Sequence, residues 1–215
     1  QAIGSNRWSN CHGGDNIHKA VVRVDERNLP SFLRPVFVEV LRNVRNAYAK
    51  MGLLFVFMNG DQDYLGNEKP SGTNIKFSFQ RGDGWIGLAI VGNPSIQRCN
   101  SEIWCRYEYK YRPGNIVREW TTLINHELGH NCGLGHTRGG KMNPSLVEGL
   151  PPEWTTNDPS HRNLTSWFSG VPIDLGDIPD PPPDDDDDVP DIGHPLSDAF
   201  QLHDGVRARL FRVFG

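Results

Sequence analysis

The sequence predicts an α+β fold in which a twisted mixed sheet of five strands packs against two long helices. Five short segments rich in β-branched and aromatic residues supply the strands, and two longer segments carry apolar residues at three- and four-residue steps, as helices do. After His136 the pattern becomes irregular, with frequent Pro and Gly. This change predicts an irregular lower subdomain that ends in a helix.

The first strand and the first helix follow one another near the N-terminus. The segment 18–26, HKAVVRVDE, contains β-branched apolar residues and predicts a strand. In the next segment Pro35 fits the first turn of a helix, and Gly52 fits a C-terminal stop. Between them the expected helix has one apolar face, made of Phe37, Val40, Leu41, Val44 and Tyr48.

Four further strands precede the second long helix. The run 53–58, LLFVFM, is typical of a short buried strand, and 74–79, NIKFSF, alternates as a half-buried strand does. The segments 85–92, WIGLAIVG, and 102–111, EIWCRYEYKY, predict two more strands. The second helix is expected in the segment 115–133, NIVREWTTLINHELGHNCG, with its buried side formed by Ile116, Trp120, Leu123 and Ile124.

Composition divides the chain into three parts. Residues 1–175 hold all of these periodic segments and a last short helix expected near 161–170, so we interpret them as one folded domain. Residues 176–194 are rich in Pro and Asp, cannot bury a core and predict an extended linker. Residues 195–215 are apolar again and fit either an amphipathic helix or a hairpin, so their role stays open.

The charge distribution and the hydropathy exclude two classes of partner. The net charge of −4 is local, because residues 163–206 contain eleven Asp and no Lys, Arg or Glu. No clustered basic face is evident elsewhere, which argues against a nucleic-acid partner. No apolar run approaches the roughly 20 residues that cross a bilayer, which argues against a membrane span. We expect a monomer.

A cluster of histidines marks the candidate site. His126 and His130 are four residues apart, so on a helix they project from one face and can reach one metal ion. Glu127 stands where the motif H-E-x-x-H places the base that acts on metal-bound water. Gly133 allows the chain to leave the helix with a positive φ, after which His136 can return as a third ligand.

This donor set suits zinc and hydrolysis. Three neutral imidazoles leave one zinc ion its full charge and one open position, where the pKa of a bound water falls to about 7. With Glu127 as base, nucleophile, base and electrophile are present together, which is what hydrolysis of a peptide bond requires. The competing interpretation is a helix whose histidines only cap or form hydrogen bonds in the core.

The pattern His126-Glu127-x-x-His130-x-x-Gly133-x-x-His136 resembles the signature of the metzincin zinc peptidases. Met142, with Pro144 two residues on, resembles their Met-turn, and the letters HELGHNCGLGH with Met-x-Pro look most like the matrixins. The likeness covers roughly residues 17–170 and implies a zincin-like catalytic domain within residues 1–175. It also implies a zinc endopeptidase that acts on a protein or peptide substrate.

The resemblance implies roles for two further segments. Met142 would form an apolar floor beneath the metal without binding it. The strand WIGLAIVG would be the sheet edge along which an extended substrate lies antiparallel, at Gly87, Leu88, Ala89 and Ile90. The sequence departs from the family in the short gap between His136 and Met142, and in the lack of a histidine before WIGLAIVG, which argues against a second, structural zinc.

Calcium is a possible second ion, with no site assigned. Asp61, Asp63 and Asp83 lie in plausible loops, whereas the run of five consecutive Asp is typical of a solvated segment. The other histidines lack ligand spacing and are expected at the surface or in packing: His12, His18, His161, His194 and His203.

Four cysteines suit two disulfides in an oxidising compartment, so we expect a secreted, extracellular protein. Cys99 and Cys105 can close the short loop between them, which leaves Cys11 to pair with Cys132. Four reduced thiols remain the alternative. Cys11 in NCHGGD also has a weak likeness to a cysteine switch, in which a pro-segment thiolate blocks the zinc.

Two functions compete with an active enzyme. One is a catalytically silent binding module that keeps zinc for structure, against which the intact Glu127 argues. The other is a latent precursor in which a terminal segment occupies the cleft.

Overall fold

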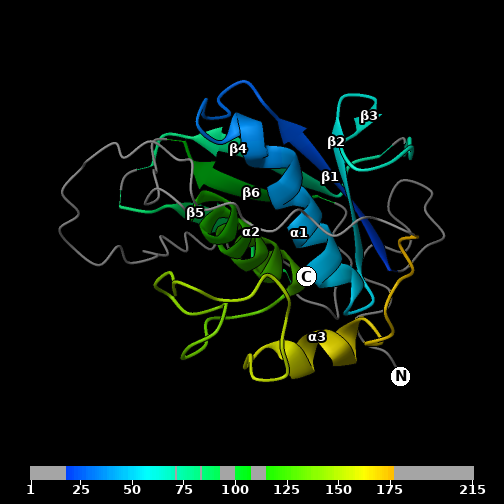
Figure 1. Ribbon diagram of the computed structural model, residues 1–215, viewed down its shortest axis with the longest axis vertical. Coiled ribbons are helices and arrows are strands. Elements are labelled where there is room, and N and C mark those ends of the chain that lie inside the picture. Colours follow the sequence, from blue (N-terminus) through cyan, green and yellow to red (C-terminus); the bar gives the residue numbers. More distant parts are fainter. Residues whose placement is uncertain (1–17, 71, 83, 93–99, 108–114, 177–215) are drawn as a thin grey trace, which may run out of the picture.

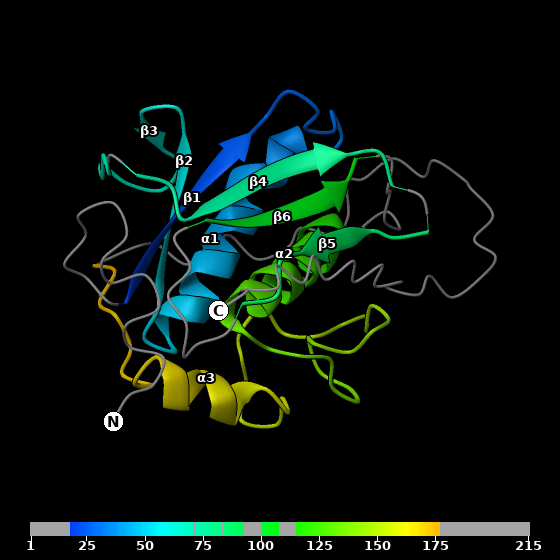
Figure 2. The same ribbon diagram turned by 180° about the vertical axis from the view of Figure 1, so that it is seen from behind.

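The computed structural model describes residues 18–70, 72–82, 84–92, 100–107 and 115–176. In these residues one sheet carries two long helices on the same face, and a third, short helix lies below them (Figure 1). Seen from behind, the strands lie in front of those two helices (Figure 2). The predicted α+β architecture with a mixed sheet is therefore confirmed.

The sheet has parallel strands in its centre and an antiparallel strand at each edge. Its order is β3-β2-β1-β4-β6-β5. Parallel pairing joins β2 to β1, β1 to β4, and β4 to β6, whereas β3 and β5 pair antiparallel to β2 and β6. The bounds of the strands are β1 Lys19–Asp25, β2 Leu54–Asn59, β3 Gln62–Asp63, β4 Ile75–Gln80, β5 Gly87–Ala89 and β6 Ser101–Arg106.

Within the described part of the chain the sheet has six strands, so the prediction of five strands was wrong: it missed β3. The chain reverses at Gly60, whose φ of +57° suits glycine, and then pairs Gln62 and Asp63 with the end of β2. A strand of two residues is too short to produce a readable alternation of apolar and polar positions, so the sequence pattern gave no sign of it.

The first long helix begins two residues later than its proline suggests. Pro35 lies in a 3-10 turn, Arg34–Val36, and α1 follows as Phe37–Ala49. The predicted apolar face is confirmed, because its five residues are all at most 2% exposed. Gly52 has a φ of +92° and lies in the turn that leads to β2, where the sequence predicts the stop.

The second long helix, α2, spans Ile116–Cys132 and is more deeply buried than the sequence indicates. Trp120, Leu123 and Ile124 are fully buried as predicted, but every residue from 119 to 132 is buried as well. Contacts from β5, β6 and α1 account for this, together with the Asn125 side chain, which donates a hydrogen bond to the Pro152 carbonyl. A helix covered on all sides shows no amphipathic stripe.

A hydrogen bond fixes α2 against α1 just before the first histidine. The Tyr48 hydroxyl on α1 donates to the carbonyl oxygen of Asn125 over 2.6 Å. Tyr48 also packs edge-on against Phe55 of β2, so one side chain joins both helices to the sheet. The short helix α3, His161–Trp167, follows near the predicted position and buries Leu164.

No helix among the described residues is long and apolar enough to span a membrane.

Candidate metal centre

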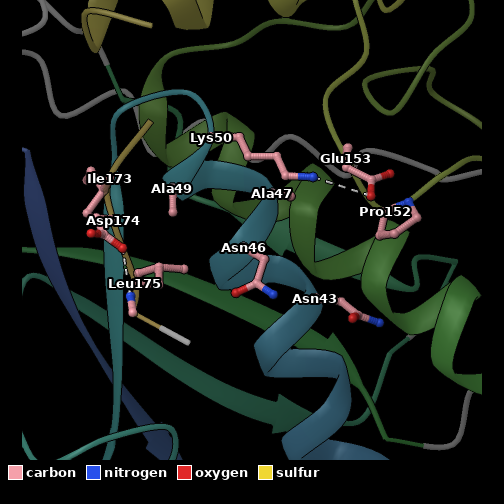
Figure 3. Close-up of a pocket in the computed structure, with 11 residues that line it drawn as sticks. Asn43, Asn46, Ala47, Ala49, Lys50, Pro152, Glu153, Ile173, Asp174 and Leu175 are labelled. Atoms are coloured by element: carbon pink, nitrogen blue, oxygen red, sulfur yellow. Dashed lines mark hydrogen bonds and ion pairs between the residues drawn. The ribbon is translucent and has the colours of Figure 1, made fainter. Parts of the chain in front are cut away.

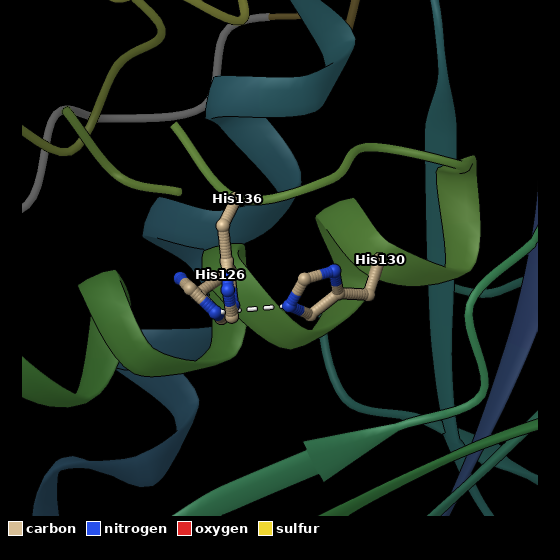
Figure 4. Close-up of side chains that lie close together, drawn as sticks. All are labelled: His126, His130 and His136. Atoms are coloured by element: carbon tan, nitrogen blue, oxygen red, sulfur yellow. Dashed lines mark hydrogen bonds between the residues drawn. The ribbon is translucent and has the colours of Figure 1, made fainter. Parts of the chain in front are cut away.

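The side chains of His126, His130 and His136 converge on one point (Figure 4). The first two project from neighbouring turns of α2, and their ring centroids lie 4.7 Å apart. His136 comes from the segment after the helix, with its ring 5.4 Å from that of His126 and 5.0 Å from that of His130. No two of the three ligand nitrogens are more than 4.8 Å apart.

Gly133 produces the turn that returns His136 to the helix. Its φ is +102°, in the left-handed region that favours glycine, and its N–H donates back to the carbonyls of Gly129 and His130. Leu134 N–H also donates to Gly129 O over 3.0 Å. These bonds end α2 within a few residues of its last ligand, as the sequence predicts.

Hydrogen bonds to the backbone fix the tautomer of both helical histidines. Nδ1 of His126 lies 2.6 Å from the carbonyl oxygen of Lys141, and Nδ1 of His130 lies 2.8 Å from that of Leu134. A carbonyl oxygen only accepts, so each Nδ1 carries the proton and donates it. Each Nε2 therefore presents a bare lone pair to the centre of the cluster.

The two Nε2 atoms, joined by the line in Figure 4, are only 3.0 Å apart. A hydrogen bond between them would need a second proton on one ring and hence an imidazolium. Burial lowers the pKa of His126 to about 3 and that of His130 to about 4, with a smaller contribution from the neighbouring rings, so both rings are neutral near pH 7. Two facing lone pairs repel one another unless a cation lies between them.

The donor set fits a metal ion that prefers nitrogen. Tetrahedral zinc with bonds of about 2.0–2.1 Å holds two nitrogens roughly 3.3 Å apart, close to the 3.0 Å between the two Nε2 atoms. Among the residues that the structure describes, these three histidines are the one group of three side chains that could hold an ion. Three histidines close together can thus bind a metal.

Glu127 lies beside the histidines, on the side of α2 that faces β5. A helix advances by about 100° per residue, which places Glu127 about 60° around the helix from His130. Its side chain is 1% exposed. Its negative charge reaches the buried Cys105 on β6 and adds to the desolvation that raises the pKa of that thiol.

Met142 packs against α2 at Gly129, between the two helical histidines in the sequence. It is fully buried, and its Sδ lies 2.7 Å from the place where a Cβ on Gly129 would stand. Only a glycine at 129 leaves room for the thioether at this distance. Pro144 is exposed two residues on. The short segment after His136 is closed by a hydrogen bond from Thr137 N–H to Met142 O over 2.9 Å.

Lys141 is a site residue that the sequence did not indicate. Its carbonyl holds His126, while its buried ammonium donates to the carbonyls of Pro151 and Glu153 over 2.7 Å and 2.5 Å. Desolvation lowers its pKa to about 8. Its N–H donates to the carboxylate of Asp158. A lysine in a loop has no pattern that predicts burial, so only the fold shows this role.

The strand expected to bind substrate lies at the sheet edge. Gly87, Leu88 and Ala89 form β5, and Ile90 continues it with a hydrogen bond from its N–H to Glu102 O. The edge position agrees with the sequence analysis. The binding of a substrate there stays a prediction.

Several predicted residues lie outside the described residues or outside the cluster. Cys105 on β6 and Cys132 on α2 are buried. Their expected partners, Cys99 for Cys105 and Cys11 for Cys132, lie outside the described residues, so both disulfides stay predictions. Asp61 and Asp63 join no group of three possible ligands, and the Asp63 carboxylate accepts the N–H groups of Leu65 and Glu68. The residues left undescribed include Asp83, His12, His194 and His203.

A separate cavity of about 310 Å³ lies between the end of α1 and the segments 152–153 and 173–176 (Figure 3). It contains none of the three histidines. An ion pair between Lys50 and Glu153, 3.6 Å long, lies on its wall.

Comparisons with known proteins do not assign the chain to a family. No protein-family model matches it, and no curated protein matches it. Among solved structures it is similar to the crystal structure of myroilysin, with 16% sequence identity over 84% of this chain and 71% of that chain, and with a TM-score of 0.30. The function must therefore be judged from the residues of the site.

Proposed function

We propose that this chain is a zinc-dependent endopeptidase of the metzincin type, in which Glu127 acts as the general base. The observation that carries the proposal is the pair of facing, proton-free Nε2 atoms of His126 and His130, with His136 beside them and a carboxylate on the adjoining side of the helix. This constellation offers three ligands and a base from one helix and the turn after it.

Zinc, when bound by the three histidines, supplies a Lewis acid that activates water and polarises a carbonyl. The remaining roles belong to side chains and backbone groups of this chain. The Lys141 and Leu134 carbonyls hold the two helical imidazoles in the tautomer that binds a metal. Glu127 accepts a proton on its carboxylate and returns it to the amine that leaves.

The edge of β5 is suited to hold an extended peptide. In an antiparallel pair, hydrogen-bonded residues alternate with residues whose backbone groups point away from the partner strand. Arg106 N–H donates to Ile86 O and Ile90 N–H to Glu102 O, so the residues between them, Gly87 and Ala89, direct their backbone groups outward. A peptide can add to this edge as a further strand.

The proposal is tested by two variants in which zinc content and peptide hydrolysis are measured separately. Glu127→Gln keeps the shape of the side chain and all three ligands, so zinc content should stay stoichiometric while hydrolysis of a fluorogenic peptide falls by about 10²–10⁴-fold or more. His136→Ala removes one ligand, so zinc should be lost on dialysis and activity with it.

His161→Ala serves as the matched control, because His161 begins α3 and is not part of the cluster. It should retain both zinc and activity. Full activity in Glu127→Gln would rule out the proposed base. Stoichiometric zinc with no hydrolysis of any peptide in the unmodified chain would instead identify a silent binding module.

A further inference from the structure

The Glu127 carboxylate occupies the space that a side chain on Gly87 would need. A Cβ at Gly87 would stand 2.1 Å from Oε1 and 2.7 Å from Cδ of Glu127, and 2.8 Å from Cδ1 of Leu123. The backbone of Gly87 is outside the positive-φ region, so any residue could adopt it. Glycine is therefore required at 87 because there is no room for a side chain, and not because of its backbone conformation.

Hydrogen bonds hold β5 in place beside α2. On one side β5 is paired with β6, with Gly87 opposite Cys105. Just after the strand, the Asn131 side chain on α2 donates to Ile90 O over 2.8 Å, and Gly92 N–H donates to His130 O over 2.7 Å. A methyl group at 87 would thus be accommodated mainly by the flexible end of Glu127.

We propose that Gly87 is a positioning residue that sets where the Glu127 carboxylate stands. The proposal rests on the function proposed above. Because the backbone of Gly87 also points outward at the edge of β5, one residue aligns both the base and the edge to which a peptide can add. A side chain at 87 displaces the base while the edge and the three histidines remain in place.

The first test compares Gly87→Ala with Gly66→Ala, both as the zinc-loaded full chain. Gly66 lies away from the three histidines and has no positive φ, and the atom nearest to its Cβ position is the flexible carboxylate end of Asp63 at 3.2 Å. Gly66→Ala therefore reports the effect of a glycine-to-alanine substitution outside the site. Gly87→Ala should lower kcat for a fluorogenic peptide by at least about tenfold, with KM and zinc content within about twofold of the unmodified chain. Gly66→Ala should change none of the three.

The second test does not depend on activity. Gly87→Ala should lower Tm much more in the unmodified background than in the Glu127→Ala background, where the carboxylate is gone and only the contact with Cδ1 of Leu123 remains. Such non-additivity is the signature of two groups in contact. If Gly87→Ala alone does not fold, the double variant should fold.

The outcomes separate the two proposals. Full activity in Glu127→Gln would remove the proposed function. An inactive Glu127→Gln beside a fully active Gly87→Ala would remove only the role of Gly87. Equal losses of Tm in both backgrounds, or a double variant that does not fold, would also overturn it.

Discussion

Acid should destabilise the metal-free protein well above the pH at which carboxylates titrate. Burial lowers the pKa of His126 from 6.5 to about 3 and that of His130 from 6.5 to about 4. The pKa of each ring is thus lower in the folded state than in the unfolded state. As the pH falls, the unfolded chain therefore binds protons before the folded protein does. The folded state keeps its full stability above about pH 6.5 and loses it progressively down to about pH 4.

The size of the effect follows from these values. At pH 5 each unfolded imidazole has gained a proton that its folded counterpart has not, which amounts to about 2 kcal/mol per ring and about 4 kcal/mol for both. Domains of this size are typically stable by about 5–15 kcal/mol, so the loss should be plainly measurable.

The assay is urea unfolding of the chelator-treated protein at pH 8, 6 and 5. The free energy of unfolding should fall by about 4 kcal/mol between pH 8 and pH 5. His126→Gln should reduce that fall by about half, because one of the two titrating rings is gone. A free energy of unfolding that is flat within about 1 kcal/mol over this range would refute the assignment of two buried neutral rings.

Three substitutions probe the surroundings of the cluster. Gly133→Ala places a side chain on a residue with a φ of +102°, so it should lower the free energy of unfolding by about 1–2 kcal/mol, measured by thermal unfolding. Because Gly133 forms the turn that leads to His136, this substitution should also weaken zinc binding, measured by chelator competition. Met142→Ala empties a fully buried site and should cost about 2–5 kcal/mol in urea unfolding. Lys141→Met removes two hydrogen bonds from a buried ammonium and should cost about 2–3 kcal/mol; an unchanged urea midpoint would show that the ammonium does not stabilise this loop.

The elements with strong local patterns were predictable from the sequence. The apolar residues from Phe37 to Tyr48 recur at helical spacing, and the helix α1 that they predict was confirmed. Ile75, Phe77 and Phe79 alternate with polar residues as in a half-buried strand, and the strand β4 was confirmed. The convergence of the three histidines was also predictable, because His126 and His130 share a helix face and Gly133 marks the turn that follows. These signals are local and need no knowledge of the fold.

What the sequence could not indicate depends on contacts between distant segments. Lys141 is buried only because residues 151–153 pass over it and offer their carbonyls. The short strand β3 exists only because Gly60 reverses the chain onto β2. The fit between Gly87 and Glu127 joins residues forty positions apart, and neither has a sequence neighbour that signals the contact.

The three histidines differ in exposure, and this difference predicts which of them a metal ion would reach first. His126 and His130 are buried and already held by the backbone, whereas His136 is exposed. A metal ion held by this cluster would be reached from solvent first at the exposed imidazole, while the backbone already orients the two buried nitrogens. We therefore expect the rate at which a chelator removes zinc to depend on how readily the segment 134–136 moves, and not on any opening of α2.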